Sequence, residues 1–296
     1  SIEHSFFQTD SIINLQDIVV TGTKTPKKKI NSPIMINIIN SETISNVQAC
    51  NLSETLSFQT GLRIETDCQT CNYTQLRING MSGGFSQVLI NGRPTFSPLM
   101  GLYALEQFPS NMIEKIEVMK GAGSTLYGSS AIGGTVNIIT KIPKRNSSQI
   151  EINTRSIDRQ ANDYSIVGNA SIISESKKSG LSLFINKRER EAYDNNKDNF
   201  SELPYLNNIS FGTNMYFMPK ENQKLDINFN SIYEYRYGGE MQDEIPAHFA
   251  EQSEERTHNI LAGGFDYQIN FNNYESSFIS YVAYQNTDRE HYTGIK

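Results

Sequence analysis

Residues 225–237 read Leu-Asp-Ile-Asn-Phe-Asn-Ser-Ile-Tyr-Glu-Tyr-Arg-Tyr, and their alternation decides the fold. One set of alternate positions is mostly apolar or aromatic: Leu225, Ile227, Phe229, Tyr233, Tyr235 and Tyr237. The other set is polar or charged: Asp226, Asn228, Asn230, Glu234 and Arg236. Successive side chains of a strand point to opposite faces of a sheet, so the stretch predicts a β-strand with one apolar face and one wet face.

Similar alternating runs occur on both sides of this stretch, at 181–190, 209–217 and 259–271. The turns near 176–179, 219–222 and 272–273 are short, whereas the connections 191–206 and 238–255 are long and polar. Alternating short and long connections are typical of an outer-membrane β-barrel, and the tyrosines that close the 225–237 run fit its aromatic girdle. A soluble β-sandwich is the alternative, although its strands are usually shorter and its turn signals more frequent.

The number of strands predicts an incomplete barrel. About seven strands fit between Ser148 and Asp288. A closed bacterial barrel has an even number of strands, and one that encloses a folded domain needs roughly twenty-two. We therefore expect residues 146–296 to form the first strands of a barrel that polypeptide outside this sequence completes.

An α+β domain is predicted before these strands, at residues 26–145. The predicted strands are 34–39, 75–78, 87–90, 116–119 and 135–139, and the turn Gly80–Gly84 is expected to join the second strand to the third as a tight reversal. Asn51 and Glu54 resemble a capping box, and Gly61 is expected to end the helix that follows. The character of the chain changes at 141–145, where the domain ends.

A glycine-rich segment separates the last two predicted strands of this domain. It contains Gly121, Gly123, Gly128, Gly133 and Gly134. A nucleotide-binding loop does not match, because the third glycine of the dinucleotide motif is replaced by leucine and no Gly-Lys-Ser/Thr ending follows. We expect the glycines to permit close contact between this backbone and the encircling barrel.

Composition excludes several functions. The 296 residues carry a formal net charge of −6, so nucleic acid is not an expected partner. No run of about eighteen apolar residues forms a transmembrane helix. The N-terminus lacks a basic region followed by an apolar core, so we expect any signal peptide to have been removed. Paired carboxylates, a Ser/His/Asp set and a metal-ligand cluster are not recognisable, so an enzyme is not expected.

Three cysteines occur, at Cys50, Cys68 and Cys71. The Cys68-Gln-Thr-Cys71 motif could be a redox site, half of a zinc site or a structural disulfide. We favour a disulfide that pins a loop, because residues 72–78 read as extended rather than as the helix that a thioredoxin-like site requires. Cys50 is then left unpaired, and a thiol enzyme that uses the pair remains a rival hypothesis.

The first 25 residues are expected to be a tail. Within it Asp17-Ile-Val-Val-Thr-Gly-Thr23 is a short strand-forming run between polar segments. No neighbouring segment offers this run a strand partner, so its backbone would be available to the sheet edge of another protein. The alternative is that it forms the first strand of the following domain.

Taken together, these residues resemble the TonB-dependent outer-membrane receptors. Residues 17–23 look like a TonB box, 77–81 and 88–94 look like plug strands, and 113–140 looks like the terminal signature of the plug. The Cys-x-x-Cys motif before an Arg-x-Asn-Gly strand is most similar to the branch that contains haem and cobalamin receptors. The resemblance implies an α+β plug domain followed by antiparallel strands of a transmembrane barrel, with 22 strands expected in the complete protein.

The resemblance also implies roles for particular residues. The residues expected to bind TonB are Asp17, Ile18, Val19, Val20, Thr21, Gly22 and Thr23. The expected plug signature is Arg77, Gly80, Gly121, Tyr127, Gly128, Gly133, Gly134 and Asn137. The expected substrate-facing residues of the plug loops are Tyr73, Phe85, Arg93, Phe96, Met100 and Tyr103. If the cargo is haem, His248 and His258 are the candidate axial ligands.

The implied function is energy-coupled uptake of a scarce metal chelate, with haem or cobalamin favoured and other iron complexes as further candidates. Haem or cobalamin would be cargo, so we expect neither a resident cofactor nor a metal bound to the protein itself. The expected partners are a TonB-type transducer in the periplasm, the lipids of the outer membrane of a Gram-negative bacterium and a surface lipoprotein. A passive barrel or a surface adhesin is the alternative.

Overall fold

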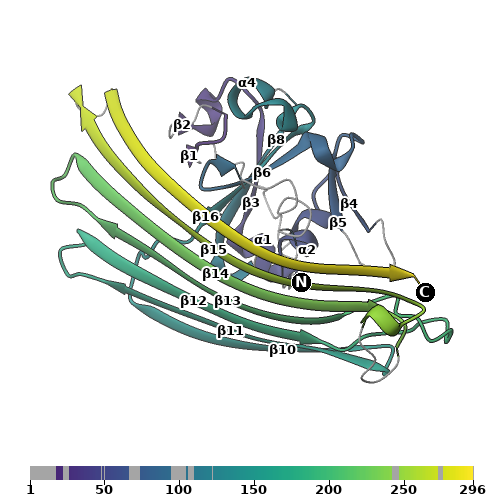
Figure 1. Cartoon of the computed structure of the whole chain (residues 1–296). Coiled ribbons are helices and arrows are strands. Elements are labelled where there is room, and N and C mark those ends of the chain that lie inside the picture. Colours follow the sequence, from purple (N-terminus) through teal and green to yellow (C-terminus); the bar gives the residue numbers. More distant parts are fainter. Residues whose placement is uncertain are drawn as a thin grey trace, which may run out of the picture.

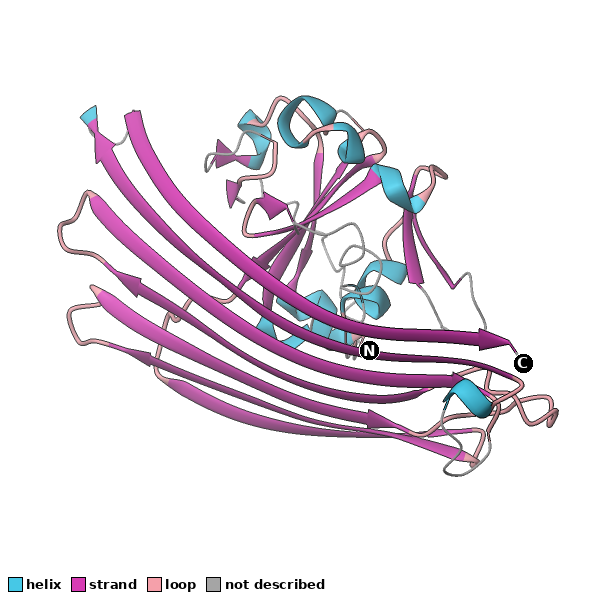
Figure 2. Cartoon of the chain, in the orientation of Figure 1, coloured by secondary structure: helices cyan, strands magenta, loops and turns pink. Residues whose placement is uncertain are grey.

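The computed structural model describes residues 18–22, 27–47, 49, 51–66, 74–94, 105, 110–121, 123–241, 247–272 and 276–295. A long, curved sheet forms one side of the molecule, and a smaller domain lies against its concave face (Figures 1 and 2). We refer to the curved sheet as the wall and to the smaller domain as the plug.

The wall consists of seven antiparallel strands that pair in sequence order. They are β10 (Ser147–Ile157), β11 (Ala161–Ile173), β12 (Ser179–Arg190), β13 (Tyr205–Phe217), β14 (Gln223–Gly239), β15 (Gln252–Phe271) and β16 (Ser276–Ile295). The order of pairing follows from the connections, because antiparallel neighbours need only a turn between them. The antiparallel partial barrel expected from the sequence is confirmed.

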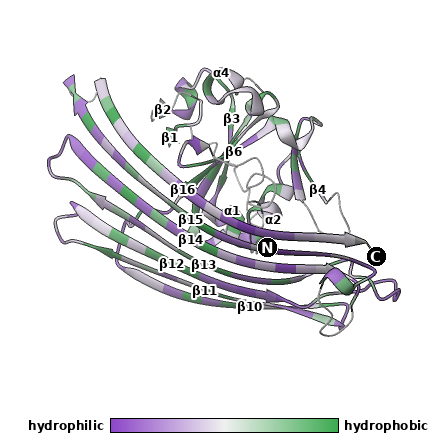
Figure 3. Cartoon of the chain, viewed as in Figure 1, coloured by the Kyte–Doolittle hydropathy of each residue, from purple (hydrophilic) through white to green (hydrophobic). Residues whose placement is uncertain are grey.

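The two faces of the wall differ as the alternation of β14 predicts. Glu234 and Arg236 are buried on the concave face, whereas Phe229 and Tyr233 are exposed on the convex face. Polar and apolar positions alternate along most of the wall strands in Figure 3. The convex face also exposes Ile150, Ile152, Ile166, Ile185, Phe211 and Phe265. Such an apolar surface suits lipid, because the backbone polar groups of these strands are satisfied within the sheet.

The connections place short turns at one end of the wall, which lies at the left in Figure 1. The turns after β11 and β13 are found there. The long connections 191–204 and 240–251 lie at the opposite end, together with the short turn 158–160 that links β10 to β11. Among the described residues, no helix has both the length and the apolar character needed to span a membrane.

The plug is built around a five-stranded sheet with the order β3-β8-β9-β6-β7. Its strands are β3 (Ile36–Asn40), β8 (Ile113–Lys120), β9 (Gly134–Thr140), β6 (Ser86–Ile90) and β7 (Arg93–Pro94). The pairs β4 (Leu62–Thr66) with β5 (Thr74–Ile78), and β1 (Ile18–Val19) with β2 (Lys27–Lys28), form two smaller sheets. The helices are α1 (Ser41–Asn46), α2 (Leu52–Ser57) and α4 (Ser124–Tyr127). Short 3-10 turns are η1 (Lys29–Asn31), η2 (Gly83–Phe85), η3 (Ser110–Met112) and η4 (Ser129–Ala131) in the plug, and η5 (Ala247–Phe249) in a wall loop.

The plug has an apolar core between α2 and the sheet. Leu52 and Leu56 of α2 pack in one cluster with residues that include Ile116, Val136 and Ile138. Helix α2 begins as predicted, because the Asn51 Oδ1 atom accepts a hydrogen bond of 3.0 Å from the backbone nitrogen of Glu54. An apolar face that packs on the sheet and a satisfied first turn together stabilise this short helix.

Two local predictions for the plug were wrong. Strands β5 and β6 do not form a hairpin, because β5 pairs with β4 whereas β6 pairs with β7 and, in parallel, with β9. Gly61 does not end α2, because the helix ends at Ser57 and is capped by Phe58. Gly61 has a positive φ of 77° and instead lies in the turn that leads into β4.

The expectation of glycine contact with the wall was also wrong for three of the glycines. A Cβ atom at Gly134 would collide with the carbonyl oxygen of Met119 in the neighbouring strand. At Gly123 it would lie 2.7 Å from the carbonyl oxygen of Ala131, and at Gly133 it would lie 3.0 Å from that of Phe85. These glycines therefore allow close packing of β6, β8, β9 and their connections inside the plug.

Candidate functional site

Residues 18–22 are docked on the plug in this structure. Ile18 and Val19 pair with Lys28 and Lys27 in an antiparallel ribbon. Thr21 is completely buried. The expectation of a run without a strand partner was therefore wrong, because a partner lies just beyond the turn, in the lysine cluster. Asp17 and Thr23, the ends of the predicted box, lie outside the described residues.

Glu117 of β8 is the centre of this docking. Its carboxylate is fully buried, and its Oε2 atom accepts hydrogen bonds from the backbone nitrogen of Val20 at 2.9 Å, the backbone nitrogen of Thr21 at 3.0 Å and the hydroxyl of Thr21 at 2.6 Å. Lys115 lies 2.8 Å from the Oε1 atom and also donates to the carbonyl of Ile18. A buried carboxylate is stable only when hydrogen bonds and an opposite charge compensate it, and both are present.

Two residues of the predicted plug signature complete the site. Asn137 of β9 donates to the Thr21 hydroxyl oxygen at 3.0 Å, and the Tyr127 hydroxyl donates to the Thr21 carbonyl at 2.9 Å. The hydroxyl and both backbone polar groups of Thr21 are thus satisfied by plug residues. We call the set Lys115, Glu117, Tyr127 and Asn137 the latch.

The hydrogen bond from Tyr127 to Thr21 predicts that the docking of residues 18–22 weakens at alkaline pH. Burial, followed by the negative charge of Glu117, raises the pKa of Tyr127 to about 12. The phenol is the donor to Thr21, so its contribution is complete below the ordinary pKa of about 10 and is lost as the pH rises towards 12. The absorbance at 295 nm should be titrated with pH in the unmodified protein and in Tyr127→Phe. The difference between the two curves should show one phenol that titrates near pH 12. A difference curve centred near pH 10 would contradict this prediction.

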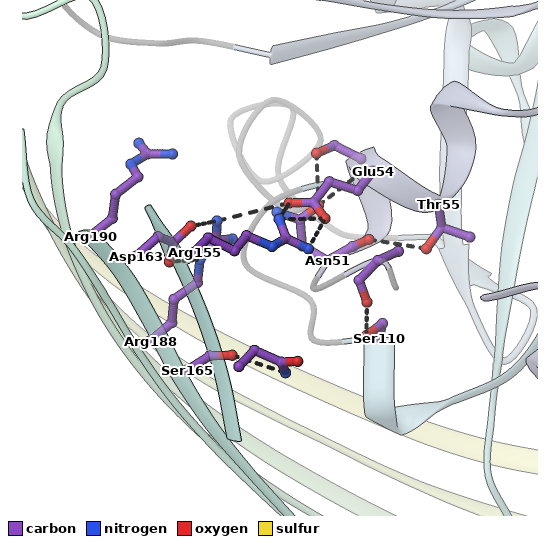
Figure 4. Close-up of polar contacts among 12 residues, drawn as sticks. Asn51, Glu54, Thr55, Ser110, Arg155, Asp163, Ser165, Arg188 and Arg190 are labelled. Carbon is purple, nitrogen blue, oxygen red and sulfur yellow. Dashed lines mark hydrogen bonds and ion pairs between the residues drawn. The ribbon is translucent and has the colours of Figure 1, made fainter. Parts of the chain in front are cut away.

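A second cluster joins the plug to the wall (Figure 4). Arg188 of β12 makes a bidentate contact with Asp163 of β11. Its Nε and Nη2 atoms donate to the two carboxylate oxygens at 2.9 Å and 2.6 Å, and both residues are buried. Arg155 of β10 binds both carboxylate oxygens of Glu54 in α2 at 3.2 Å, and Arg188 lies 3.8 Å from the same carboxylate. We call these four residues the plug–wall cluster. Glu54, which the sequence assigns to the start of α2, thus contacts the wall.

Further polar contacts connect plug and wall. Asn111 donates to Asn169 at 2.9 Å, and Asn214 donates to the carbonyl of Lys141 at 3.0 Å. Within the wall, Asp226 makes an ion pair with Lys224, and Glu234 makes one with Arg236. Phe184 of β12 packs in the apolar core cluster of the plug, so the described attachment combines polar contacts with an apolar one.

Comparison with known proteins identifies this architecture. Residues 28–135 match the family model described as TonB-dependent Receptor Plug Domain. Residues 28–135 therefore form a TonB-dependent receptor plug domain. Over 178 residues it is 29% identical to the vitamin B12 transporter BtuB of Vibrio cholerae, covering 60% of this chain and 28% of that protein. Over 178 residues it is also 29% identical to the iron-regulated outer membrane virulence protein of the same species, covering 55% of this chain and 27% of that protein.

A solved structure shows the same fold. The ferric enterobactin receptor PfeA of Pseudomonas aeruginosa, a mutant solved in complex with enterobactin, superposes with a TM-score of 0.66 at 16% identity. The match covers 85% of this chain and 41% of that chain. The chain thus spans less than half the length of these relatives, and their outer-membrane location agrees with the location expected from the sequence.

The receptor's predicted substrate-facing residues are only partly described. Tyr73, Phe96, Met100 and Tyr103 lie outside the described residues, and Phe85 is exposed at the end of η2. The substrate-facing role of Arg93 stays a prediction. Arg93 forms an ion pair with Asp266, near the end of β15 at the short-turn side, and its guanidinium lies 3.5 Å from the ring centroid of Tyr281. It therefore contacts the wall on the side opposite the long loops.

The structure describes the two predicted histidines but not the three cysteines. Cys50, Cys68 and Cys71 lie outside the described residues, so the disulfide and the placement in the haem and cobalamin branch stay predictions. His258 is buried on the concave face of β15, 3.9 Å from Glu234, whereas His248 is exposed in η5. The structure does not bring the two histidines into one described site.

An acidic trio lies in the 191–204 connection and was not predicted. Ligand atoms of Asp194, Asp198 and Glu202 lie within 4.8 Å of one another. Their carboxylates accept backbone hydrogen bonds from the loop, such as those from Lys197 to Asp194 at 2.6 Å and from Asn195 to Glu202 at 2.6 Å. The trio thereby shapes the loop.

The residues of the latch and of the plug–wall cluster were mostly missed from sequence. Glu117 lies in a predicted strand, and Arg188 falls on the polar face of the predicted run 181–190. Period-two alternation could have placed Arg188 towards the plug. It could not have named Asp163 as the partner, because Arg188 lies opposite Ser165 and reaches Asp163 diagonally across the strand pair.

Proposed function

We propose that the complete receptor imports a scarce metal chelate across the outer membrane, with cobalamin or a ferric siderophore as the cargo class. The relatives support this class, because one is a vitamin B12 transporter and a structural neighbour was solved with enterobactin. Haem remains a further candidate cargo. Neither His248 nor His258 adds a described feature in its favour.

The observation that carries the proposal is the docking of residues 18–22. A passive barrel or an adhesin would have no use for a short strand held by a few polar contacts beside a strand partner of only two residues. Such a segment can be transferred to the sheet edge of another protein, where its backbone gains a new partner. We propose that this partner is a TonB-type transducer in the periplasm.

Deletion of residues 17–23 tests the coupling. The complete receptor should then lose uptake of radiolabelled cobalamin or ferric enterobactin while it keeps surface binding of the same compound. Unchanged uptake would favour a passive barrel. Replacement of both Cys68 and Cys71 by Ser should leave uptake largely intact, whereas its complete loss would favour the rival thiol chemistry.

Titration of the complete receptor identifies the cargo. Calorimetry with cobalamin, ferric enterobactin and haem should give saturable binding for one of them, and the Soret or corrinoid absorbance should report contact with the chromophore. Binding of none of the three would contradict the proposed cargo class.

A further inference from the structure

A cavity of about 710 Å³ lies between the plug and the wall near the short-turn end. On the plug side its lining includes Val20, Arg93 and Tyr127. On the wall side it includes Asp226, Asp266 and Tyr281, from β14, β15 and β16. Neither the latch nor the plug–wall cluster requires an empty space at this position.

One side of the cavity is formed by the docked segment and its latch. Val20 belongs to residues 18–22, and its backbone nitrogen is held by Glu117. Tyr127 lines the same cavity and donates its hydroxyl to the Thr21 carbonyl. Withdrawal of the segment would therefore remove Val20 from the lining and release the Tyr127 hydroxyl in the same step. The cavity would then widen on the side from which the segment leaves.

Another plug residue of the lining, Arg93, contacts the wall directly. Arg93 forms an ion pair with Asp266 and stacks on Tyr281, so it connects the β6–β7 hairpin to two wall strands. The lining combines aliphatic and aromatic surface with carboxylates and amides. Such a mixture suits an amphipathic ligand that presents an apolar surface and a polar rim.

The plug–wall cluster lies apart from this cavity. None of Glu54, Arg155, Asp163 and Arg188 lines it, and they hold the plug through α2 and the wall through β10, β11 and β12. Removal of a partner from a buried ion pair is costly, whereas the segment 18–22 is held by a few neutral and charge-assisted hydrogen bonds. A pull on the segment should thus act on the latch before it acts on the cluster.

We propose that this cavity is the first part of the passage by which cargo leaves the receptor, between the plug and strands β14–β16, while the plug–wall cluster stays intact. The inference rests on the proposed function. Withdrawal of residues 18–22 opens the cavity on the periplasmic side, and displacement of Arg93 from Asp266 and Tyr281 opens it towards the plug interior.

Filling the cavity tests this passage. Ile279 of β16 lines it and faces Gln268 of β15, which also lines it. In the complete receptor, Ile279→Trp should lower uptake of the bound compound, cobalamin or ferric enterobactin, at least about tenfold. Gln285→Trp is the matched control, since Gln285 occupies the same strand and face but does not line the cavity.

Two further readouts separate this proposal from the proposed function. Surface binding of the compound, and cross-linking of residues 18–22 to the transducer, should be unchanged in Ile279→Trp. Uptake by Ile279→Trp at the unmodified rate would overturn the passage and leave the energy-coupled importer standing. Absence of uptake by the unmodified receptor would instead overturn the importer. If Ile279→Trp does not fold, Gln268→Trp places the same bulk on the facing strand with the same expected result.

Discussion

Glu117→Ala is expected to release residues 18–22 from the plug. The substitution removes the one carboxylate oxygen that accepts from Val20 and twice from Thr21, and it also removes the partner of Lys115. Buried donors that lose their acceptor cost about 1–3 kcal/mol, and release of the segment into water is the least costly way to satisfy them again. Amide hydrogen exchange at Val20 and Thr21 should accelerate by about 10- to 100-fold, which corresponds to about 1.5–3 kcal/mol.

Glu114→Ala is the matched control. Glu114 lies in the same strand, but its partner Lys144, at 2.5 Å, has a largely exposed side chain. Exposed pairs of this kind contribute about 0–1 kcal/mol, so exchange at Val20 and Thr21 should change less than about fivefold. Equal exchange in Glu117→Ala and the unmodified receptor would show that the carboxylate does not hold the segment. The Glu117→Ala receptor should also cross-link to the transducer without added cargo.

Most of the wall was predictable because its signal is local. Alternation in 225–237 gave the faces of β14, and the lengths of the connections gave the two ends of the sheet. Both features arise from the chemistry of one strand in contact with lipid on one side and polar groups on the other. The register of neighbouring strands then follows from short turns, as in the pairing of Phe217 with Leu225.

The plug was less predictable because its pairing is not local. Strands β5 and β6 are neighbours in sequence, yet β6 lies in parallel beside β9, whose residues follow more than forty positions later. The glycine-rich segment was recognised, but its contacts with Ala131, Phe85 and Met119 depend on that pairing. A glycine in the sequence indicates that another segment of the chain approaches its backbone closely, but it does not indicate which segment.

The candidate site shows the same division between local and distant information. Asn51 was predicted as a cap because its partner, the backbone nitrogen of Glu54, lies three residues away. The contact of the Glu54 side chain with Arg155, about one hundred residues later in the chain, had no local signal. Such a charge-assisted contact is among the stronger polar contacts, and only the tertiary fold brings its two partners together.

Arg188→Ala is expected to weaken the attachment of the plug to the wall. It leaves the buried carboxylate of Asp163 without the guanidinium that binds both of its oxygens. Removal of one partner from a buried pair typically costs about 3–5 kcal/mol, and the nearby Arg155 should reduce this towards the lower value. In the complete receptor, the urea concentration at which trypsin gains access to the plug should fall. Lys187→Ala should leave it unchanged, because Lys187 is the adjacent residue, points to the other face and contacts only wall residues among the described ones, Glu189 at 3.9 Å and Asn207.

The double variant Arg188→Ala, Asp163→Ala separates the ion pair from simple loss of packing. If the cost arises from an uncompensated charge, removal of Asp163 as well should restore part of the urea resistance, and the double variant should be more stable than Arg188→Ala alone. If the decreases in urea resistance caused by the two single substitutions add in the double variant, Arg188 contributes by packing on the plug and not by neutralising Asp163. Restoration would also indicate why the plug can stay attached during transport: two wall strands fix the position of Arg188, so the group that faces Glu54 is held in place before the plug contacts it.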